Sequence, residues 1–259
     1  MERNIQSNYE WLQRGKLRLL ITIGESWTWG DSLGEQRLEK VYGRQLADRL
    51  DADWLNIARC GESNLWIADH YVDVCDQIPS WDYKHVDIVL TLTEVGREFN
   101  GDRDHNRVYT ELLKDVETFD QFLDTLSELV AQRIRSGLDQ YPTWIGTNFI
   151  DSNYNLPLVD CTWLDLIADA TGQKKHQDRT LVVGSWVYER FDAVFEFNPT
   201  IERSAWRKSI LNHMDRSSYV TELLMASSLN YKRATKHPTP QGHQLWADYL
   251  YQKITSLSE

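Results

Sequence analysis

Short, mostly apolar runs along the chain constrain its fold more than any other feature of the sequence. The first run, residues 17–23, reads Leu-Arg-Leu-Leu-Ile-Thr-Ile and is followed directly by Gly24. Further runs of strand length cover residues 52–57, 86–93 and 143–150, and a weaker run covers residues 181–187. Apolar runs of this length, bounded by glycine or polar residues, predict buried strands.

Segments with helical periodicity lie between these runs. Apolar residues at spacings of three and four from Val108 to Val130 predict one long amphipathic helix. Residues 164–170 and 204–229 are also expected to be helical. Strands that alternate with helices predict a mainly parallel sheet with helices on both faces. No linker or repeat interrupts the pattern, so we expect residues 1–259 to form a single α/β domain.

The last predicted helix has the clearest start signal in the chain. Thr239 is suited to the N-cap and Pro240 to the first helical position. Apolar residues then follow at helical spacing, namely Trp246, Tyr249, Leu250 and Ile254. This helix is therefore expected to begin at Pro240.

Composition argues against several functional classes. The chain has 28 Lys and Arg against 39 Asp and Glu, a formal charge of −11, so we expect neither nucleic acid nor membrane as a partner. No apolar run approaches the length of a membrane span, and residues 1–16 lack the apolar core of a signal peptide, which favours a cytoplasmic location. Cys60, Cys75 and Cys161 lack the spacing of a zinc site or a disulfide framework, and we expect no metal and no cofactor.

Ser26 lies where the first predicted strand ends, within residues 24–30, Gly-Glu-Ser-Trp-Thr-Trp-Gly. Ligands of parallel α/β sheets bind at the carboxyl ends of the strands, so Ser26 is a candidate nucleophile if a histidine serves as its base. The alternative is that Ser26 caps the next helix. Trp27 and Trp29 are candidates to bind a sugar or acyl group, or else they pack that helix on the sheet. Ser32, in Gly-Asp-Ser-Leu, follows no strand and is interpreted as a turn or cap residue.

His237 precedes the last helix and is the candidate base. Pro238 biases it to an extended conformation, which places it in a loop that can meet the serine of the first strand. It would then take the hydroxyl proton and later return it to the leaving group. The alternative is a surface histidine. His243 lies inside the predicted helix and is interpreted as structural.

Together these residues resemble the conserved blocks of the SGNH, or GDSL-type, hydrolases. The first block, Gly-Asp-Ser-x-x-x-Gly, corresponds to residues 24–30 with Glu25 in place of Asp. The second corresponds to residues 56–63 and keeps Gly61, and the last corresponds to His237-Pro238 before the terminal helix. The blocks occur in order along nearly the whole chain.

The resemblance implies a three-layer flavodoxin-like α/β fold with a mainly parallel central sheet. It also implies Ser26 as nucleophile, His237 as general base and acid, and the backbone N–H groups of Ser26 and Gly61 as oxyanion donors. The alternative for Gly61 is an ordinary turn glycine.

Two blocks depart from the family pattern. The residue three before His237 is Ala234, where the family has Asp, so a backbone carbonyl or a remote carboxylate such as Asp215 would have to orient the imidazole. Asp215 is otherwise read as a solvated helix residue. Where the family has Gly-x-Asn-Asp, residues 93–98 read Thr-Glu-Val-Gly-Arg-Glu. Arg97 can replace the missing oxyanion Asn, or it can form a surface ion pair.

Two functions of different classes follow. The first is a serine ester hydrolase that acts on a small-molecule or glycan ester, such as an acylated carbohydrate. The second is a catalytically degenerate scaffold that binds carbohydrate or is a structural component of a virion. The missing Asp and Asn support the second. Residues 25–33 also resemble SGNH-type reading frames of tailed phages, which implies virion association as the alternative to a cytoplasmic location. A nucleotide-binding role is less favoured because the first turn has neither GxGxxG nor a Walker lysine. The sequence does not indicate an oligomeric state.

Overall fold

The computed structural model describes residues 10–31, 33–93, 108, 111–112, 114–148, 154–172, 231–232 and 237–256. Several sequence predictions lie outside these residues. They are the strand at 181–187, the helix at 204–229, and the positions Ser32, Arg97, Asp215 and Ala234.

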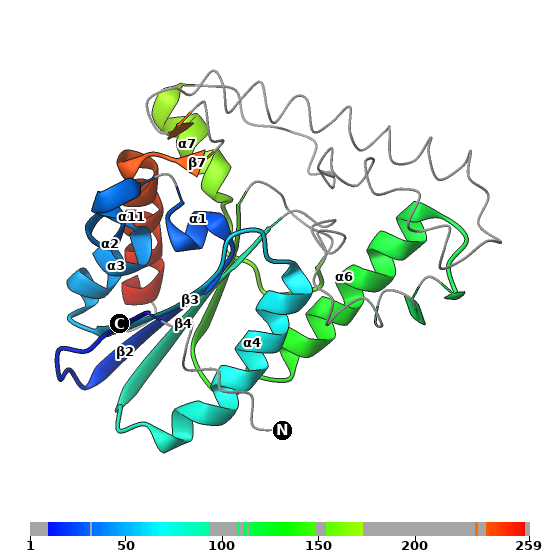
Figure 1. Ribbon diagram of the computed structural model, residues 1–259, viewed down its shortest axis with the longest axis horizontal. Coiled ribbons are helices and arrows are strands. Elements are labelled where there is room, and N and C mark those ends of the chain that lie inside the picture. Colours follow the sequence, from blue (N-terminus) through cyan, green and yellow to red (C-terminus); the bar gives the residue numbers. More distant parts are fainter. Residues whose placement is uncertain are drawn as a thin grey trace.

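A five-stranded sheet forms the centre of the described protein (Figure 1). Its strands are β1 (Glu10–Leu12), β2 (Arg18–Gly24), β3 (Asp53–Ala58), β4 (His85–Leu92) and β5 (Thr143–Thr147). The spatial order is β1-β3-β2-β4-β5, and all pairs are parallel except the edge pair β1 with β3. The four parallel strands thus follow the order second, first, third, fourth, as in flavodoxin-like sheets. The predicted mainly parallel sheet is confirmed.

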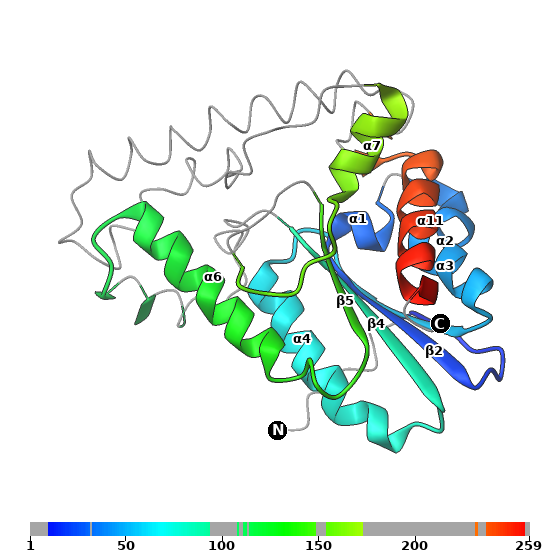
Figure 2. The same ribbon diagram turned by 180° about the vertical axis from the view of Figure 1, so that it is seen from behind.

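Helices cover both faces of this sheet, which gives three layers (Figures 1 and 2). On one face lie α4 (Asn64–Gln77) and α6 (Phe119–Arg135), and on the other lie α3 (Tyr42–Leu50) and α11 (Pro240–Ser256). The shorter elements are α1 (Ser26–Trp29), η2 (Gly34–Gln36), α2 (Arg37–Lys40), η3 (Ile78–Ser80), α7 (Trp163–Thr171), and the two-residue strands β6 (Tyr231–Lys232) and β7 (His237–Pro238). No helix in the described ranges has both the length and the apolar character needed to cross a bilayer.

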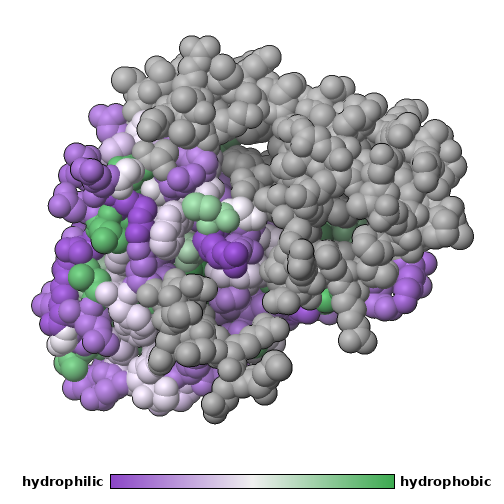
Figure 3. Space-filling model, viewed as in Figure 1, coloured by the Kyte–Doolittle hydropathy of each residue, from purple (hydrophilic) through white to green (hydrophobic). Residues whose placement is uncertain are grey.

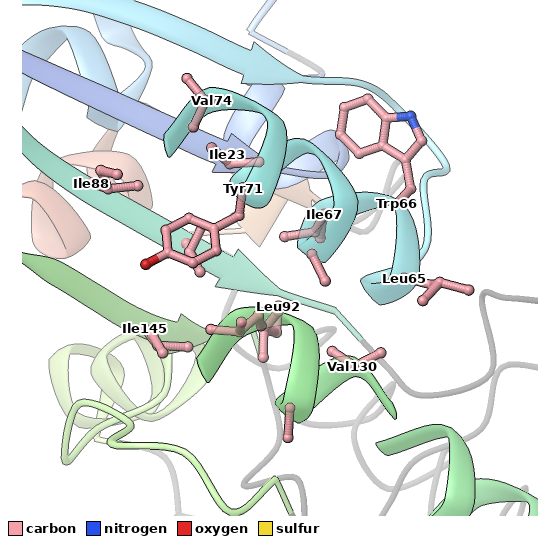
Figure 4. Packing of buried hydrophobic residues seen from close by; sticks show 14 of the residues in the cluster. Ile23, Leu65, Trp66, Ile67, Tyr71, Val74, Ile88, Leu92, Val130 and Ile145 are labelled. Atoms are coloured by element: carbon pink, nitrogen blue, oxygen red, sulfur yellow. The ribbon is translucent and has the colours of Figure 1, made fainter. Parts of the chain in front are cut away.

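Alternating residues of the central strands feed two separate cores. In β2, Leu19 and Ile21 face α4 and α6, whereas Leu20 faces α3 and α11. Figure 4 shows the first of these cores, in which Tyr71 of α4 lies over the sheet near Ile145. Because both faces are covered, the central strands are mostly apolar, which explains why they could be recognised as continuous runs.

The segment predicted as one long helix between Val108 and Val130 is interrupted. Helix α6 begins only at Phe119, because Thr118 is its N-cap and forms a capping box with Gln121. The apolar spacing on which the prediction rested continues through the interruption, so periodicity alone did not reveal it. By contrast, α11 begins at Pro240 as predicted, and the Thr239 hydroxyl accepts from the Gly242 N–H at 3.4 Å.

The surface is mainly polar where Figure 3 shows described residues. Hydrophilic and neutral residues make up most of the coloured part of this face, and apolar residues form small separate spots between them. Large exposed apolar side chains among the described residues include Trp11, Leu17 and Leu38. Isolated apolar residues of this kind are ordinary on a globular protein.

Candidate active site

The turn after β2 carries the candidate nucleophile. Gly24 ends the strand, and a Cβ atom at this position would lie 2.1 Å from the Thr28 hydroxyl and 3.1 Å from the Thr91 carbonyl oxygen. Only glycine therefore fits where the chain turns from β2 into α1. Ser26 is the first residue of α1 and is 3% exposed. The N-cap of α1 is Glu25, so the alternative cap role considered for Ser26 belongs to its neighbour.

Ser26 and His237 meet at the carboxyl end of the sheet, although 211 positions separate them in the chain. The distance between Ser26 Oγ and His237 Nε2 is 2.9 Å. His237 belongs to β7, which pairs antiparallel with β6 so that His237 lies opposite Lys232. This geometry is the hydrogen-bonded contact that a serine nucleophile and its base require.

The Glu25 carboxylate is buried against the nucleophile. One of its oxygens, Oε2, accepts from the Ser26 N–H at 2.5 Å and also from the Ser26 hydroxyl. The other, Oε1, accepts from the Trp27 N–H at 3.0 Å and from Asn148 Nδ2 at 2.5 Å. Glu25 is 0% exposed. The Ser26 N–H, which the family resemblance assigns to the oxyanion hole, therefore already donates to this carboxylate.

A second carboxylate approaches the histidine from the solvent side. Asp31 Oδ2 lies 3.4 Å from His237 Nε2, and the Asp31 side chain is 51% exposed. Both Ser26 and Asp31 thus face the same ring nitrogen. This contact is with Nε2, whereas the Asp of a Ser-His-Asp triad contacts Nδ1.

The loop after β3 lies beside the Ser26 turn. Gly24 and Ala58 are paired across β2 and β3, and the Arg59 N–H donates to the Gly24 carbonyl at 3.2 Å. Gly61 follows in this loop with φ of 81°, a conformation that favours glycine. Its position at the carboxyl edge is compatible with either a turn or an oxyanion role, and the oxyanion role remains a prediction.

The two tryptophans after the nucleophile have different environments. Trp27 is 2% exposed and packs edge-to-face on Trp163 of α7 at a ring distance of 5.3 Å. Its assignment to substrate binding was wrong, because the ring is buried in the core on the α3 and α11 side. Trp29 is half-buried, and the Arg37 guanidinium lies 3.8 Å from its ring centroid. Only Trp29 retains surface for a ligand.

His243 is enclosed in the aromatic core behind the site. It is 0% exposed, and its Nδ1 accepts from the Tyr42 N–H at 3.3 Å. Burial, with a smaller contribution from nearby His237, lowers the pKa of His243 to about 3. A ring that remains neutral and accepts a backbone hydrogen bond has the structural role interpreted for it from the sequence.

Sequence reasoning missed two polar residues of the site, Asn148 and Asp31. Asn148 was placed inside a predicted strand, but β5 ends at Thr147 and Asn148 turns its amide towards Glu25. The only local sign of its role was the presence of an Asn within an otherwise mostly apolar predicted strand. Asp31 was considered only as part of the Gly-Asp-Ser-Leu sequence, and nothing local links it to His237. The described residues contain no cluster of three or more His, Cys, Asp or Glu that could hold a metal ion.

No family model matches the chain, and no curated protein matches it. Among solved structures, the chain is similar to a lipolytic protein of the G-D-S-L family from Veillonella parvula, with 14% identity, coverage of 92% of this chain and 98% of that chain, and a TM-score of 0.39. It is also similar to a G-D-S-L family protein from Desulfitobacterium hafniense, with 10% identity, 90% and 98% coverage, and a TM-score of 0.38. A third similar structure is the esterase EstA from a Pseudoalteromonas species, with 12% identity, 92% and 97% coverage, and a TM-score of 0.36.

Structural similarity at 10–14% sequence identity does not show what a protein does, so the functional proposal rests on the residues of the site. The chain has a three-layer α/β fold with a mainly parallel sheet, and solved structures of G-D-S-L lipolytic proteins and esterases are among those to which it is similar.

Proposed function

We propose that this protein is a carboxylic ester hydrolase in which Ser26 is the nucleophile and His237 is the general base and acid. The observation that carries the proposal is the 2.9 Å contact between Ser26 Oγ and His237 Nε2. The contact lies at the carboxyl end of the parallel strands, where α/β proteins bind their ligands. A serine alone is a weak nucleophile, and a histidine within hydrogen-bond distance is what activates it.

The reaction follows from these two side chains. Ser26 Oγ attacks the ester carbonyl while His237 Nε2 takes the hydroxyl proton. When the tetrahedral intermediate collapses, the bond to the alcohol oxygen breaks and Nε2 returns the proton to that oxygen. Water then repeats the sequence on the acyl-enzyme, which releases the carboxylic acid and restores Ser26. His237 must carry its other proton on Nδ1 for the first step.

The proposed substrate is an acylated carbohydrate or another small ester. Trp29 supports this choice, because its half-buried ring lies three residues after the nucleophile and aromatic rings stack well on sugars. The Gly61 N–H, on the adjoining loop, is the proposed oxyanion donor. Arg97 is the second proposed oxyanion donor, on the basis of its position in the sequence after the third predicted strand.

The test is hydrolysis of p-nitrophenyl acetate by the full chain and by Ser26→Ala. The variant should lose at least about 10³-fold in kcat/KM while its circular dichroism and unfolding midpoint stay near those of the parent. Ser136→Ala, at an exposed helix end, is the matched control and should keep full activity. If Ser26→Ala hydrolyses the ester at the parental rate, the proposal is wrong.

A second candidate function is supported by Glu25. A scaffold that binds a carbohydrate, or serves in a virion, has no need of an available nucleophile, and the Glu25 carboxylate accepts both the N–H and the hydroxyl of Ser26. A fluorophosphonate probe separates the two candidates, since it reacts only with an activated serine. Absence of labelling together with measurable binding to acetylated oligosaccharides would favour the scaffold.

A further inference from the structure

The hydroxyl of Ser26 has two neighbours that can accept its single proton. Glu25 Oε2 lies on one side and His237 Nε2 on the other. A neutral hydroxyl carries one hydrogen, so it donates to one of these groups at a time. The structure has the hydroxyl donating to Glu25. If the hydrogen turned to His237, an oxygen lone pair of Ser26 would face the carboxylate at hydrogen-bonding distance, which is repulsive.

The surroundings of His237 favour the same arrangement of protons. Nε2 faces Ser26 Oγ at 2.9 Å and Asp31 Oδ2 at 3.4 Å. A carboxylate oxygen can only accept, so a hydrogen on Nε2 satisfies both contacts, whereas a bare Nε2 lone pair would oppose Asp31. With the hydrogen on Nε2, the ring donates to Ser26 and is not available to take the serine proton.

Fixed donors hold the Glu25 carboxylate in this place. The Ser26 and Trp27 N–H groups and Asn148 Nδ2 can only donate, and they contact both carboxylate oxygens. Glu25 is also fully buried, so water does not compete for these oxygens. The side chain is therefore fixed beside the nucleophile by contacts that do not depend on a substrate.

We infer that Glu25 is a positioning residue that holds Ser26 in a resting arrangement, with its hydroxyl turned to the Glu25 carboxylate and its N–H withdrawn from the oxyanion position. The inference rests on the proposed function, and it adds a residue that acts on the reaction through Ser26. Reaction then requires the hydroxyl to turn to His237 and the Nε2 proton to leave. Each change costs free energy before ester attack.

Side-chain length gives a direct test. Aspartate is one methylene shorter, keeps the charge and is a favoured N-cap, so Glu25→Asp should keep α1 capped while drawing the carboxylate back from Ser26. The second-order rate constant for fluorophosphonate labelling should rise about tenfold, the size expected for losing one hydrogen bond to an ionised group. In ester hydrolysis the gain should appear in kcat with KM nearly unchanged, which a general loosening of the fold would not produce.

Glu25→Gln is the second variant, and it decides the question if Glu25→Asp does not fold. It keeps the length of the side chain and removes the charge, so labelling should again be faster than in the parent. Unfolding midpoints measured in parallel identify a variant that has lost its fold. Faster labelling supports the inference even if the parent itself does not label.

Two other outcomes overturn it, and they differ in what they imply for the proposed function. If the parent labels at Ser26 and the folded variants label no faster, Glu25 does not restrain the nucleophile, but the hydrolase proposal stands. If neither the parent nor any folded variant labels, both the inference and the hydrolase proposal are wrong.

Discussion

Asn148 donates from Nδ2 to Glu25 Oε1 at 2.5 Å and so joins the end of β5 to the turn that carries Ser26. The two residues are 123 positions apart, and both are buried, Asn148 to 1% exposure. The Asn148 N–H donates in turn to the Leu92 carbonyl at the end of β4. The carboxyl ends of three strands are thereby tied together around the candidate nucleophile.

Removal of the Asn148 amide should destabilise the protein. Asn148→Ala leaves a buried carboxylate oxygen without one of its donors, which costs about 1–3 kcal/mol. Asn148→Asp should cost more, since it places a second buried carboxylate against Glu25. Urea unfolding followed by circular dichroism measures both changes. Gln140→Ala, an exposed control, should shift the unfolding free energy by less than about 0.5 kcal/mol. Parental stability in both Asn148 variants would show that the contact contributes nothing.

The two tryptophans beside Ser26 should respond differently to substitution. Trp27→Ala removes a buried ring that packs on Trp163 and should cost about 3–5 kcal/mol of unfolding free energy. Trp29→Ala loses mainly the contact with the Arg37 guanidinium, worth about 0.5–1 kcal/mol. If Trp29 contacts a sugar, KM for an acetylated oligosaccharide should rise several-fold while KM for p-nitrophenyl acetate changes little. Equal KM changes for both substrates would contradict a sugar contact.

The sequence predicted the parts of the fold that leave a local signal. Strands β2 to β5 are covered on both faces and are therefore recognisable as apolar runs, and α11 has its start encoded in Thr239-Pro240. The edge strand β1 was not predicted, because its three residues, Glu-Trp-Leu, have no pattern of their own and are held by pairing with β3.

Within the site, the strand-end serine and the loop histidine could be located, but their surroundings could not. Asn148 reaches Glu25 only through the order of strands in the sheet, and Asp31 reaches His237 only through the turn after α1. The burial of Trp27 likewise depends on α7, far along the chain. Contacts between distant segments leave no periodicity in the sequence, so they become visible only once the fold is known.

Thiol reactivity should separate the three cysteines, because they differ in exposure. Cys60 is exposed in the loop after β3, whereas Cys75 is 1% exposed and burial raises the pKa of its thiol to about 11. Ellman's reagent at pH 8 should therefore modify Cys60 rapidly and leave Cys75 unreacted until urea is added, with half-buried Cys161 between them. Cys60→Ser should abolish the rapid phase. A rapid phase that persists in this variant would mean that another thiol is accessible.

Buried His243 should make the protein less stable as the pH falls. The pKa of His243 is about 3 in the folded protein, against an ordinary value of 6.5. Between these two pH values the unfolded chain therefore binds a proton that the folded protein excludes. Stability attributable to His243 is then fully present above pH 6.5 and declines by about 1.4 kcal/mol per pH unit below it.

The variant His243→Gln keeps an acceptor for the Tyr42 N–H and has no side chain that titrates. The unfolding free energy of the parent minus that of the variant should therefore decrease with this slope from pH 6.5 to pH 5. The exposed His85→Gln variant controls for general effects of losing a histidine and should follow the parent. A parent-minus-variant difference that stays constant over this range would mean that His243 accepts a proton in the folded state.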